Sequence, residues 1–135
     1  MPFTGSAEDR LAIRELLETY ADAVTRQDAE AWGSTWAEDS EWSLPDYPEI
    51  GATKGRAAIV AMWKEAMKAY PGIMFEAWPG SIEVNGDTAI VRSWTSEIYD
   101  QDGLTKRDRG RYEDVCVKIG GRWYFKSRSF RNTHR

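Results

Sequence analysis

A chain of 135 residues with a formal net charge of -4 and a pI of about 5.1 is long enough for one domain around a single core, and its acidic balance does not suit a general polyanion binder. Its only cysteine, Cys116, excludes an internal disulfide and a thiolate metal cluster, while its only histidine, His134, excludes histidine zinc sites and Ser-His-Asp triads within one chain. No apolar run resembles a signal peptide or is long enough to span a membrane, so we expect a cytoplasmic protein. We also expect the protein to hold no metal and no cofactor.

Hydrophobic spacing predicts two helices near the start of the chain. Apolar side chains recur three and four residues apart over 8–26, which is the pattern of one buried helical face. Asp28 then has the residue type and position of a helix N-cap, and Trp32 and Trp36 follow one turn apart. A short second helix is therefore predicted over 29–36.

The rest of the chain predicts a third helix and a sheet. An apolar stripe over 54–70 ends at Pro71-Gly72, a pair that stops a helix. Runs of strand-forming residues bounded by turn residues predict strands at 40–44, 73–78, 81–84, 88–99 and two long strands within 110–130. Asn85-Gly86 and Gly120-Gly121 have the residue types of two-residue hairpin turns, and 46–52 is expected to be a loop.

Helices first and a mostly antiparallel sheet after them indicate an α+β fold, with the helices on one face of the sheet. We expect one domain over 1–135, with loose termini at 1–7 and 132–135. Ten Lys or Arg side chains from Leu104 onward are interleaved with aromatic residues, a pattern that can indicate nucleic-acid binding. No recognition motif accompanies them, so a solvated strand face is the preferred interpretation and no nucleic-acid partner is expected.

A curved sheet with helices on one face leaves a mouth that side chains do not fill, and ligand sites favour such mouths. The seven tryptophans and six tyrosines suit an apolar cavity with a few polar groups, although plain core packing is the alternative for each of them. Strand alternation puts Glu76 and Trp78 on one face of their strand, and Arg92 and Trp94 on one face of the next. The sequence leaves open which face points inward.

Four segments carry a resemblance to a known family: AIRELLETYADAV, KGRAAIVAMW, NGDTA and GRYEDVCVKIGGRWYF. They resemble the SnoaL-like branch of the nuclear-transport-factor-2-like (NTF2-like) fold, over about residues 8–131. The resemblance implies a cone of three N-terminal helices and a strongly curved sheet, with a pocket inside and often a homodimer through the sheet. That fold hosts dehydratases, isomerases, cyclases and a dehydrochlorinase, so it implies no single reaction.

The catalytic residues of the dehydratase and dehydrochlorinase members match this sequence only in part. Their aspartate at the end of the first helix corresponds to Thr25, and the strand histidine that pairs with it corresponds to Trp78. The resemblance matches the tyrosine of the first helix to Tyr20, a pocket tryptophan to Trp42 and a pocket arginine to Arg128. Further pocket positions implied by the same match are Glu76, Thr88, Ile90, Arg92, Asp108, Gly110 and Tyr112.

An enzyme with this sequence needs a different base, because threonine and tryptophan do not take up a proton near neutral pH. Glu76 is the predicted base. Burial against Trp78, Trp42 and Trp94 would raise the pKa of its carboxyl toward the useful range. Asp22 is a second candidate, although its position on the first helix points to solvent.

Arginines and tyrosines are the predicted partners of a substrate oxygen. Arg128 or Arg92 is expected to orient that oxygen, while Tyr20 and Tyr112 donate hydrogen bonds to it. The alternative is that Glu76 forms a buried structural ion pair with one of the arginines. The remaining expected ligand contacts come from Thr25, Trp42, Trp78, Trp94 and Asp108.

Three functions stay open. The first is a cofactor-independent lyase, isomerase or cyclase that performs acid–base chemistry on a small apolar or aromatic substrate. The second is a non-catalytic binding protein that uses the same cavity, and the third is an assembly module that dimerises through its sheet. The last hairpin also leaves two registers open, with Arg128 opposite Glu113 or opposite Tyr112 according to the length of its loop.

Overall fold

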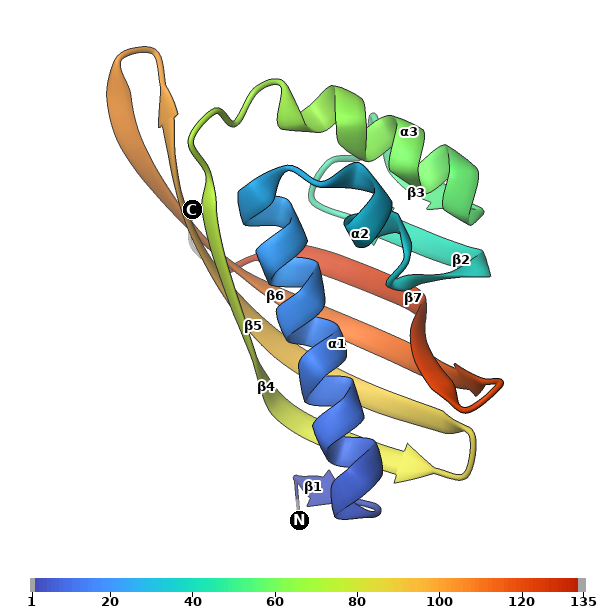
Figure 1. The fold of residues 1–135 in the computed structure, drawn as a ribbon. Coiled ribbons are helices and arrows are strands. Elements are labelled where there is room, and N and C mark those ends of the chain that lie inside the picture. Colours follow the sequence, from blue (N-terminus) through green and yellow to red (C-terminus); the bar gives the residue numbers. More distant parts are fainter. Residues whose placement is uncertain (1, 134–135) are drawn as a thin grey trace.

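The computed structural model describes residues 2–133 as one seven-stranded sheet that curves around a long helix (Figure 1). Met1, His134 and Arg135 lie outside the described residues. The helices are α1 (Ala7–Arg26), α2 (Ala29–Gly33) and α3 (Arg56–Met67). The strands are β1 (Phe3–Thr4), β2 (Trp36–Leu44), β3 (Gly51–Lys54), β4 (Met74–Asn85), β5 (Thr88–Gln101), β6 (Leu104–Ile119) and β7 (Arg122–Asn132).

The sheet has the order β1-β4-β5-β6-β7-β2-β3. The pairs β1 with β4 and β2 with β7 are parallel, and all other neighbours are antiparallel. Helix α1 crosses the concave face, while α2 and α3 lie near β2 and β3 (Figure 1). The fold is therefore α+β, with the helices packed on a curved and mostly antiparallel sheet.

Helix α1 forms where the apolar spacing predicts it, and capping fixes both of its ends. The Ser6 hydroxyl accepts a hydrogen bond from the backbone N–H of Asp9 at 3.0 Å, and Gln27 closes the helix with a φ of 57°. The inner face of the helix is buried through Ile13, Leu17, Tyr20 and Val24. This face closes the concave side of the sheet.

Helix α2 is shorter than the predicted 29–36 segment and ends at Gly33. The hydroxyls of Ser34 and Thr35 donate hydrogen bonds back to carbonyls one turn earlier, at 2.6 and 2.7 Å. Such local bonds compete with continuation of a helix. Trp36 is consequently the first residue of β2 and not the last residue of a helix.

Four other segments differ from the prediction. Phe3–Thr4, expected to be loose, pairs with β4, and Asn132, also expected to be loose, ends β7. Gly51–Lys54, expected to lie mostly in a loop, forms β3 against β2. The strands predicted at 73–78 and 81–84 are one strand, β4, with a bulge inside it.

The bulge in β4 reverses the side-chain alternation of that strand. The register to β5 shifts between Pro79 and Ser81, which leaves Gly80 as the extra residue. Before the bulge Phe75 is on the inner face, and after it Ile82 is fully buried there. The inserted residue therefore reverses the alternation of the strand. Odd-numbered residues such as Phe75 point inward before the bulge, and even-numbered residues such as Ile82 point inward after it.

A second bulge sets the register of the last hairpin. The pairing of β6 with β7 shifts once, at Lys126, which is the extra residue. Both predicted positions for Arg128, opposite Glu113 or opposite Tyr112, are wrong, because the shift puts Arg128 opposite Asp114.

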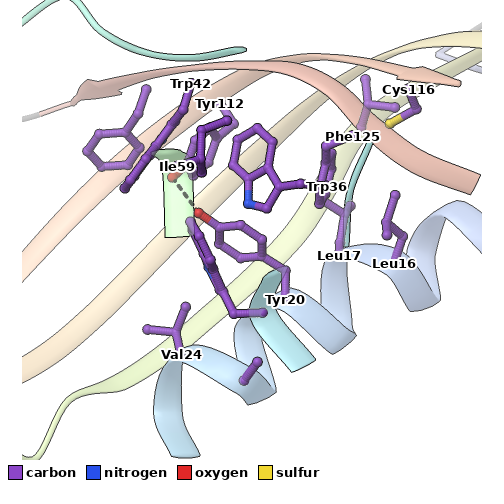
Figure 2. Close-up of a cluster of buried hydrophobic side chains, with 14 of the residues drawn as sticks. Leu16, Leu17, Tyr20, Val24, Trp36, Trp42, Ile59, Tyr112, Cys116 and Phe125 are labelled. Atoms are coloured by element: carbon purple, nitrogen blue, oxygen red, sulfur yellow. Dashed lines mark hydrogen bonds between the residues drawn. The ribbon is translucent and has the colours of Figure 1, made fainter. Parts of the chain in front are cut away.

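The core between the helices and the sheet combines aliphatic side chains with a network of aromatic rings (Figure 2). The Tyr20 ring of α1 lies 6.4 Å from Trp36 and 5.6 Å from Phe125, measured between ring centroids. Trp32 of α2 stacks on Trp63 of α3 with centroids 4.6 Å apart. Each such pair adds about 0.5–1.5 kcal/mol beyond the burial of its area, and together they hold three helices on one sheet.

Candidate functional site

A cavity of about 150 Å³ lies between α1, α3 and the inner face of the sheet. Large apolar side chains form most of its wall, among them Tyr20, Trp42, Trp63, Phe75 and Phe130. Its polar groups are few and include the carboxyls of Glu97 and Asp108 and the amide of Asn132. An apolar space with a few converging polar groups is the usual form of a small-molecule site.

Glu97 and Asp108 place two carboxyl groups side by side in this wall. They are direct partners on β5 and β6, and Phe75 is the partner of Glu97 on β4. Residues paired in this way share one face and have Cβ atoms about 4.5–5.5 Å apart. Burial, followed by the charge of Asp108, raises the pKa of Glu97 from 4.5 to about 7. Glu97 is therefore able to exchange a proton near neutral pH.

The two carboxyls have different surroundings. The Tyr99 hydroxyl donates a hydrogen bond of 2.8 Å to Oδ2 of Asp108. No hydrogen bond or ion pair to the Glu97 carboxyl occurs within residues 2–133. Tyr70 lines the cavity nearby, its ring 4.8 Å from the Tyr99 ring, and burial together with neighbouring acidic groups raises its pKa. Tyr70 therefore remains a neutral hydroxyl.

Tyr20 and Tyr112 form a hydroxyl pair at the other end of the cavity. Their oxygens are 3.0 Å apart and hydrogen-bonded to each other (Figure 2). The guanidinium carbon of Arg128 lies 3.6 Å from the centroid of the Tyr112 ring and 4.4 Å from that of Tyr20. Burial raises the pKa of both tyrosines, so both hydroxyls keep their protons at neutral pH.

Arg128 is fully buried behind this pair and does not line the cavity. Its Nε and Nη2 donate hydrogen bonds to Asp114 at 2.7 and 3.0 Å, and Nη2 also lies 3.3 Å from the Ser93 hydroxyl. Burial alone would lower the pKa of Arg128, but the charge of Asp114 raises it, so the guanidinium stays protonated. The expected direct contact of Arg128 with a ligand is therefore replaced by an ion pair with Asp114.

Four predicted site residues come together at the cavity, namely Tyr20, Trp42, Asp108 and Tyr112. Trp42 is 7 % exposed, and its indole N–H has no hydrogen-bond partner within the part of the chain that the structure describes. Among the described residues the indole N–H groups of Trp32 and Trp36 are buried without a partner in the same way, so this feature is shared by the aromatic core.

The prediction that β4 and β5 turn Glu76 and Trp94 toward the cavity is wrong. The outer face of the two strands carries Glu76, Trp78, Thr88, Ile90, Arg92 and Trp94. Trp78 is 48 % exposed there, and Glu76 is exposed beside it, on the far side of the sheet from the cavity. The predicted alternation is shifted by one residue. The bulge separates the part of β4 that holds Glu76 and Trp78 from the part that ends in the hairpin turn, so the alternation of one part does not continue into the other.

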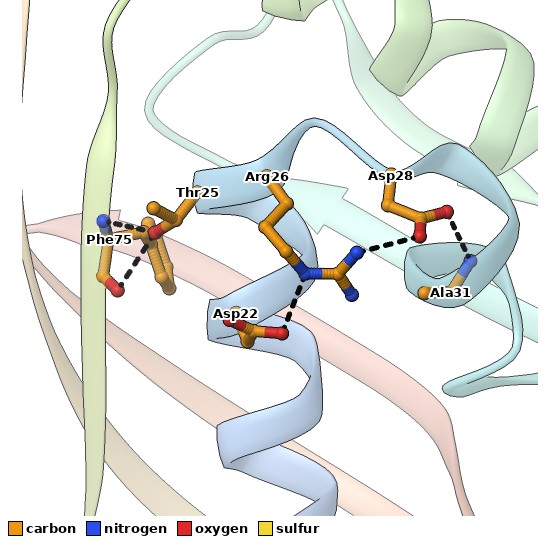
Figure 3. A network of polar contacts seen from close by, with 6 residues as sticks. All are labelled: Asp22, Thr25, Arg26, Asp28, Ala31 and Phe75. Carbon is orange, nitrogen blue, oxygen red and sulfur yellow. Dashed lines mark hydrogen bonds and ion pairs between the residues drawn. The ribbon is translucent and has the colours of Figure 1, made fainter.

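Thr25 and Asp22 do not line the cavity, and their polar contacts are shown in Figure 3. The Thr25 hydroxyl accepts a hydrogen bond from the backbone N–H of Phe75 at 2.9 Å and lies 3.5 Å from the carbonyl of the same residue. Thr25 thus joins α1 to β4 and fixes the backbone of a residue that lines the cavity. Asp22 is exposed and pairs with Arg26 at 2.8 Å, so it is not a base at this site.

Glu97 is the site residue that the sequence interpretation missed, although a signal was present. Asp102-Gly103 has the residue types of a two-residue hairpin turn, and both residues have positive φ in the structure. Counting outward from that turn makes Glu97 the direct partner of Asp108. Since Asp108 was expected to face inward, the same count places Glu97 on the inner face.

The ionisable groups of the cavity are acids and tyrosines. Among residues 2–133, no three His, Cys, Asp or Glu side chains come together as they would around a metal ion. None of the described helices has the length and apolar character needed to cross a membrane.

Comparison with known proteins assigns the family. Residues 5–129 match the SnoaL-like domain, and the chain belongs to this family. No curated protein sequence matches the chain. A solved structure of similar fold is described as an NTF2-like protein with a cystatin-like fold, in agreement with the fold that the sequence predicts.

Three solved structures illustrate the likeness. A candidate scytalone dehydratase from Novosphingobium aromaticivorans is 25% identical, with a TM-score of 0.82 over 94% of this chain and 85% of that chain. An NTF2-like protein from the same species is 27% identical, with a TM-score of 0.79 over 93% and 82% of the two chains. The type 3 LinA hexachlorocyclohexane dehydrochlorinase of Novosphingobium barchaimii is 17% identical, with a TM-score of 0.79 over 94% and 88%, and shares the fold alone.

Proposed function

We propose that this protein is a cofactor-independent acid–base enzyme of the lyase or isomerase type, acting on a small apolar or aromatic substrate in the cavity. The observation that carries the proposal is Glu97, a carboxyl in an apolar cavity with a pKa of about 7 and a second carboxyl beside it. General bases that work at neutral pH have such pKa values. The structural neighbour at 25% identity is named as a candidate dehydratase, which is an elimination enzyme, and this supports the lyase class.

In the proposed reaction, Glu97 replaces Glu76 as the base. Its carboxylate takes a proton from a substrate carbon, and the electron pair of that C–H bond forms a double bond. In an elimination the leaving group departs with the electron pair of the bond that joined it to the neighbouring carbon. In an isomerisation the electron pair of the C–H bond instead delocalises onto a conjugated oxygen, and it then forms a bond between another carbon and the returning proton. Asp108 raises the proton affinity of Glu97 through its charge.

The hydroxyl pair of Tyr20 and Tyr112 is the proposed partner of the substrate oxygen on which charge develops. Donors fixed in a dry site stabilise such charge without reorganising during the reaction. Arg128 is the proposed positioning residue, since it acts through the two rings on which it stacks and does not touch the substrate. The ion pair with Asp114 keeps the guanidinium in that place.

Ring opening of nitrobenzisoxazole tests the base directly. In this reaction a base removes the ring C–H proton, the N–O bond breaks, and a coloured cyanophenolate forms, with no other reactant. Wild type is expected to accelerate the ring opening, and Glu97→Gln to lower kcat/KM by about a hundredfold, the size of a general-base contribution. The rate should rise with pH through about 7 in wild type, because the carboxylate is the active form.

Glu76→Gln is the matched control for this experiment. The substitution is chemically identical, but Glu76 lies on the outer face of the sheet, so kcat/KM should stay at the wild-type value. Equal rates for wild type and Glu97→Gln would refute the assignment and favour the non-catalytic binding protein.

We also propose a homodimer through the outer face of the sheet. Trp78 and Trp94 are direct partners there, and Met74, Trp78 and Ile90 are 63, 48 and 59 % exposed. Large apolar side chains exposed on one face of a sheet favour an interaction surface there. Light scattering is expected to give twice the chain mass of 15.4 kDa for wild type and the single-chain mass for Trp78→Ser. A monomeric wild type at micromolar concentration would refute the dimer.

A further inference from the structure

We infer that Phe130 is a specificity-determining residue: its ring lies on Gly110 in the floor of the cavity and limits the ligand to compact ring compounds, without a second ring joined to the first. The inference rests on the proposed function, because it names the substrate class of the same site. It stands on the seat of the Phe130 ring, the volume of the cavity, and the polar group that the ring covers.

Gly110 leaves a gap in the row of inward side chains on β6, and the Phe130 ring fills it. Asp108 and Tyr112 line the cavity, whereas Gly110, between them on the same face, does not. A methyl group added to Gly110 would overlap Cε1 and Cζ of the Phe130 ring. The ring therefore occupies the place that a side chain at position 110 would take, and only glycine leaves room for it.

The Phe130 ring forms a wall between the strands and the cavity. Phe130 is the partner of Tyr112 across β6 and β7, and the centroids of the two rings are 4.9 Å apart. Phe130 is 9 % exposed and lines the cavity. Because the strand is on one side of the ring and the Tyr112 ring is beside it, a displaced Phe130 ring moves toward the cavity.

A hydroxyl group lies under the same ring. Thr95 is the partner of Gly110 on β5, and its Oγ1 would lie 2.8 Å from the methyl group added to Gly110. Thr95 is 2 % exposed and does not line the cavity. Without the Phe130 ring, the space above Gly110 would join the cavity, with the Thr95 hydroxyl at its edge. That hydroxyl can donate and accept a hydrogen bond, so the added space suits a ring that carries a hydroxyl.

The cavity volume of about 150 Å³ is that of a site able to take up benzene. A second ring joined to the first needs the space of another ring, and Phe130 holds such a space. An additional ring normally strengthens binding to an apolar site, because more apolar surface leaves water. A second ring that brings no gain in affinity is therefore the sign of a size limit.

Phenol and para-phenylphenol, which has one more ring, test the limit by calorimetric titration of the whole protein. Wild type is expected to bind para-phenylphenol no more tightly than phenol. Phe130→Ala should raise the affinity for para-phenylphenol at least about tenfold and change that for phenol by less than about threefold. Phe130→Leu, a milder truncation, should shift the ratio of the two affinities in the same direction. Phe3→Ala is the matched control on β1, outside the cavity wall, and should keep the wild-type ratio.

The seat of the ring is tested by the opposite change. Gly110→Ala pushes the Phe130 ring into the cavity and should lower the phenol affinity at least about tenfold. The double variant Gly110→Ala/Phe130→Ala should recover the phenol affinity of Phe130→Ala, because the methyl group no longer meets a ring. A purely structural loss would instead grow with the second truncation.

A second hydroxyl at the far end of the ligand tests the role of Thr95. Dihydroxybiphenyl, which is para-phenylphenol with that hydroxyl, should bind to Phe130→Ala about threefold more tightly than para-phenylphenol. Thr95→Val in the Phe130→Ala background should remove the gain. A gain that persists without the Thr95 hydroxyl would contradict its place under the ring.

The outcomes separate this inference from the proposed function. An unchanged ratio of affinities in Phe130→Ala, tighter binding of para-phenylphenol by wild type, or no binding of either phenol would overturn the size limit. Ring opening of nitrobenzisoxazole tests Glu97 as a base whatever the phenols do. A shifted ratio with ring opening unchanged in Glu97→Gln keeps the size limit and removes the base. The reverse result keeps the base and removes the size limit.

Discussion

Replacing Glu97 by glutamine is expected to stabilise the protein at alkaline pH and to leave its stability unchanged at acid pH. Gln has nearly the shape of a protonated Glu and carries no charge. In the wild-type protein an ionised Glu97 must stand beside Asp108 in a partly buried position, which costs free energy. The variant avoids this cost at every pH.

The size and sign of the effect follow from the pKa of Glu97 in the two states. It is about 7 in the folded protein and 4.5 ordinarily, so between these values the folded state holds a proton that the unfolded state has lost. Stability contributed by the protonated group is therefore complete below pH 4.5 and is lost as pH rises through 7. At 1.36 kcal/mol for each pH unit, the total is about 3 kcal/mol.

Urea unfolding of wild type and Glu97→Gln at about pH 4 and pH 8 measures this difference. The variant should gain up to about 3 kcal/mol over wild type at the higher pH and almost nothing at the lower one. Glu76→Gln, exposed on the outer face, is the control and should change stability by less than about 0.5 kcal/mol at both. A Glu97→Gln effect of equal size at both pH values would refute the burial of Glu97 beside Asp108.

Three other substitutions test the packing behind the site. Arg128→Met leaves Asp114 buried without its cation and should cost about 3–5 kcal/mol in urea unfolding, so a loss below 1 kcal/mol would contradict a fully buried pair. Gly110→Ala adds a Cβ that would overlap the ring of Phe130, and thermal unfolding should report a loss of about 1–3 kcal/mol; an unchanged Tm would mean that the ring moves freely. Trp42→Ala removes ring surface from the cavity wall and should raise KM for nitrobenzisoxazole by about tenfold with a smaller change in kcat, whereas an unchanged KM would place the substrate elsewhere.

Local signals in the sequence were sufficient to predict the elements of the fold. The apolar spacing of α1 and α3 and the turn pair Asn85-Gly86 act within one turn or one hairpin, and the structure has helices and a hairpin at these places. The order of the elements predicted helices on one face of a mostly antiparallel sheet, and the resemblance to the SnoaL-like family added the strong curvature of that sheet. Short irregular strands such as Gly51–Lys54 were missed, because their pairing depends on distant partners.

The faces of the strands could not be predicted in the same way, because alternation gives two equal answers. Asp108 and Tyr112 were assigned inward correctly on β6, whereas Glu76 and Arg92 were assigned inward and lie outside. Counting residue pairs from β6 back through the Asp102-Gly103 turn would have shown that Glu97 lies on the inner face of β5 and Arg92 on the outer face. To predict which β4 residues point inward, the position of its one-residue bulge must also be known, and a bulge has no reliable sequence signal.

The bulge at Lys126 in β7 likewise decides on which face of the sheet the Arg128 side chain lies. Trp123 and Phe125 are inward on β7, so uninterrupted alternation would continue with Ser127 inward and Arg128 outward. The extra residue turns Arg128 inward instead, directly opposite Asp114, where each charge is balanced by the other behind the tyrosine rings. The cation that reaches the inner face is thereby bound by Asp114 and kept out of the cavity wall, while Glu97 and Asp108 remain in it. The one-residue insertion in β7 thus gives the inward Asp114 its counter-ion, while the acidic character of the cavity comes from Glu97 on β5 and Asp108 on β6. The overall composition of the chain, with ten basic side chains after Leu104, indicates neither feature.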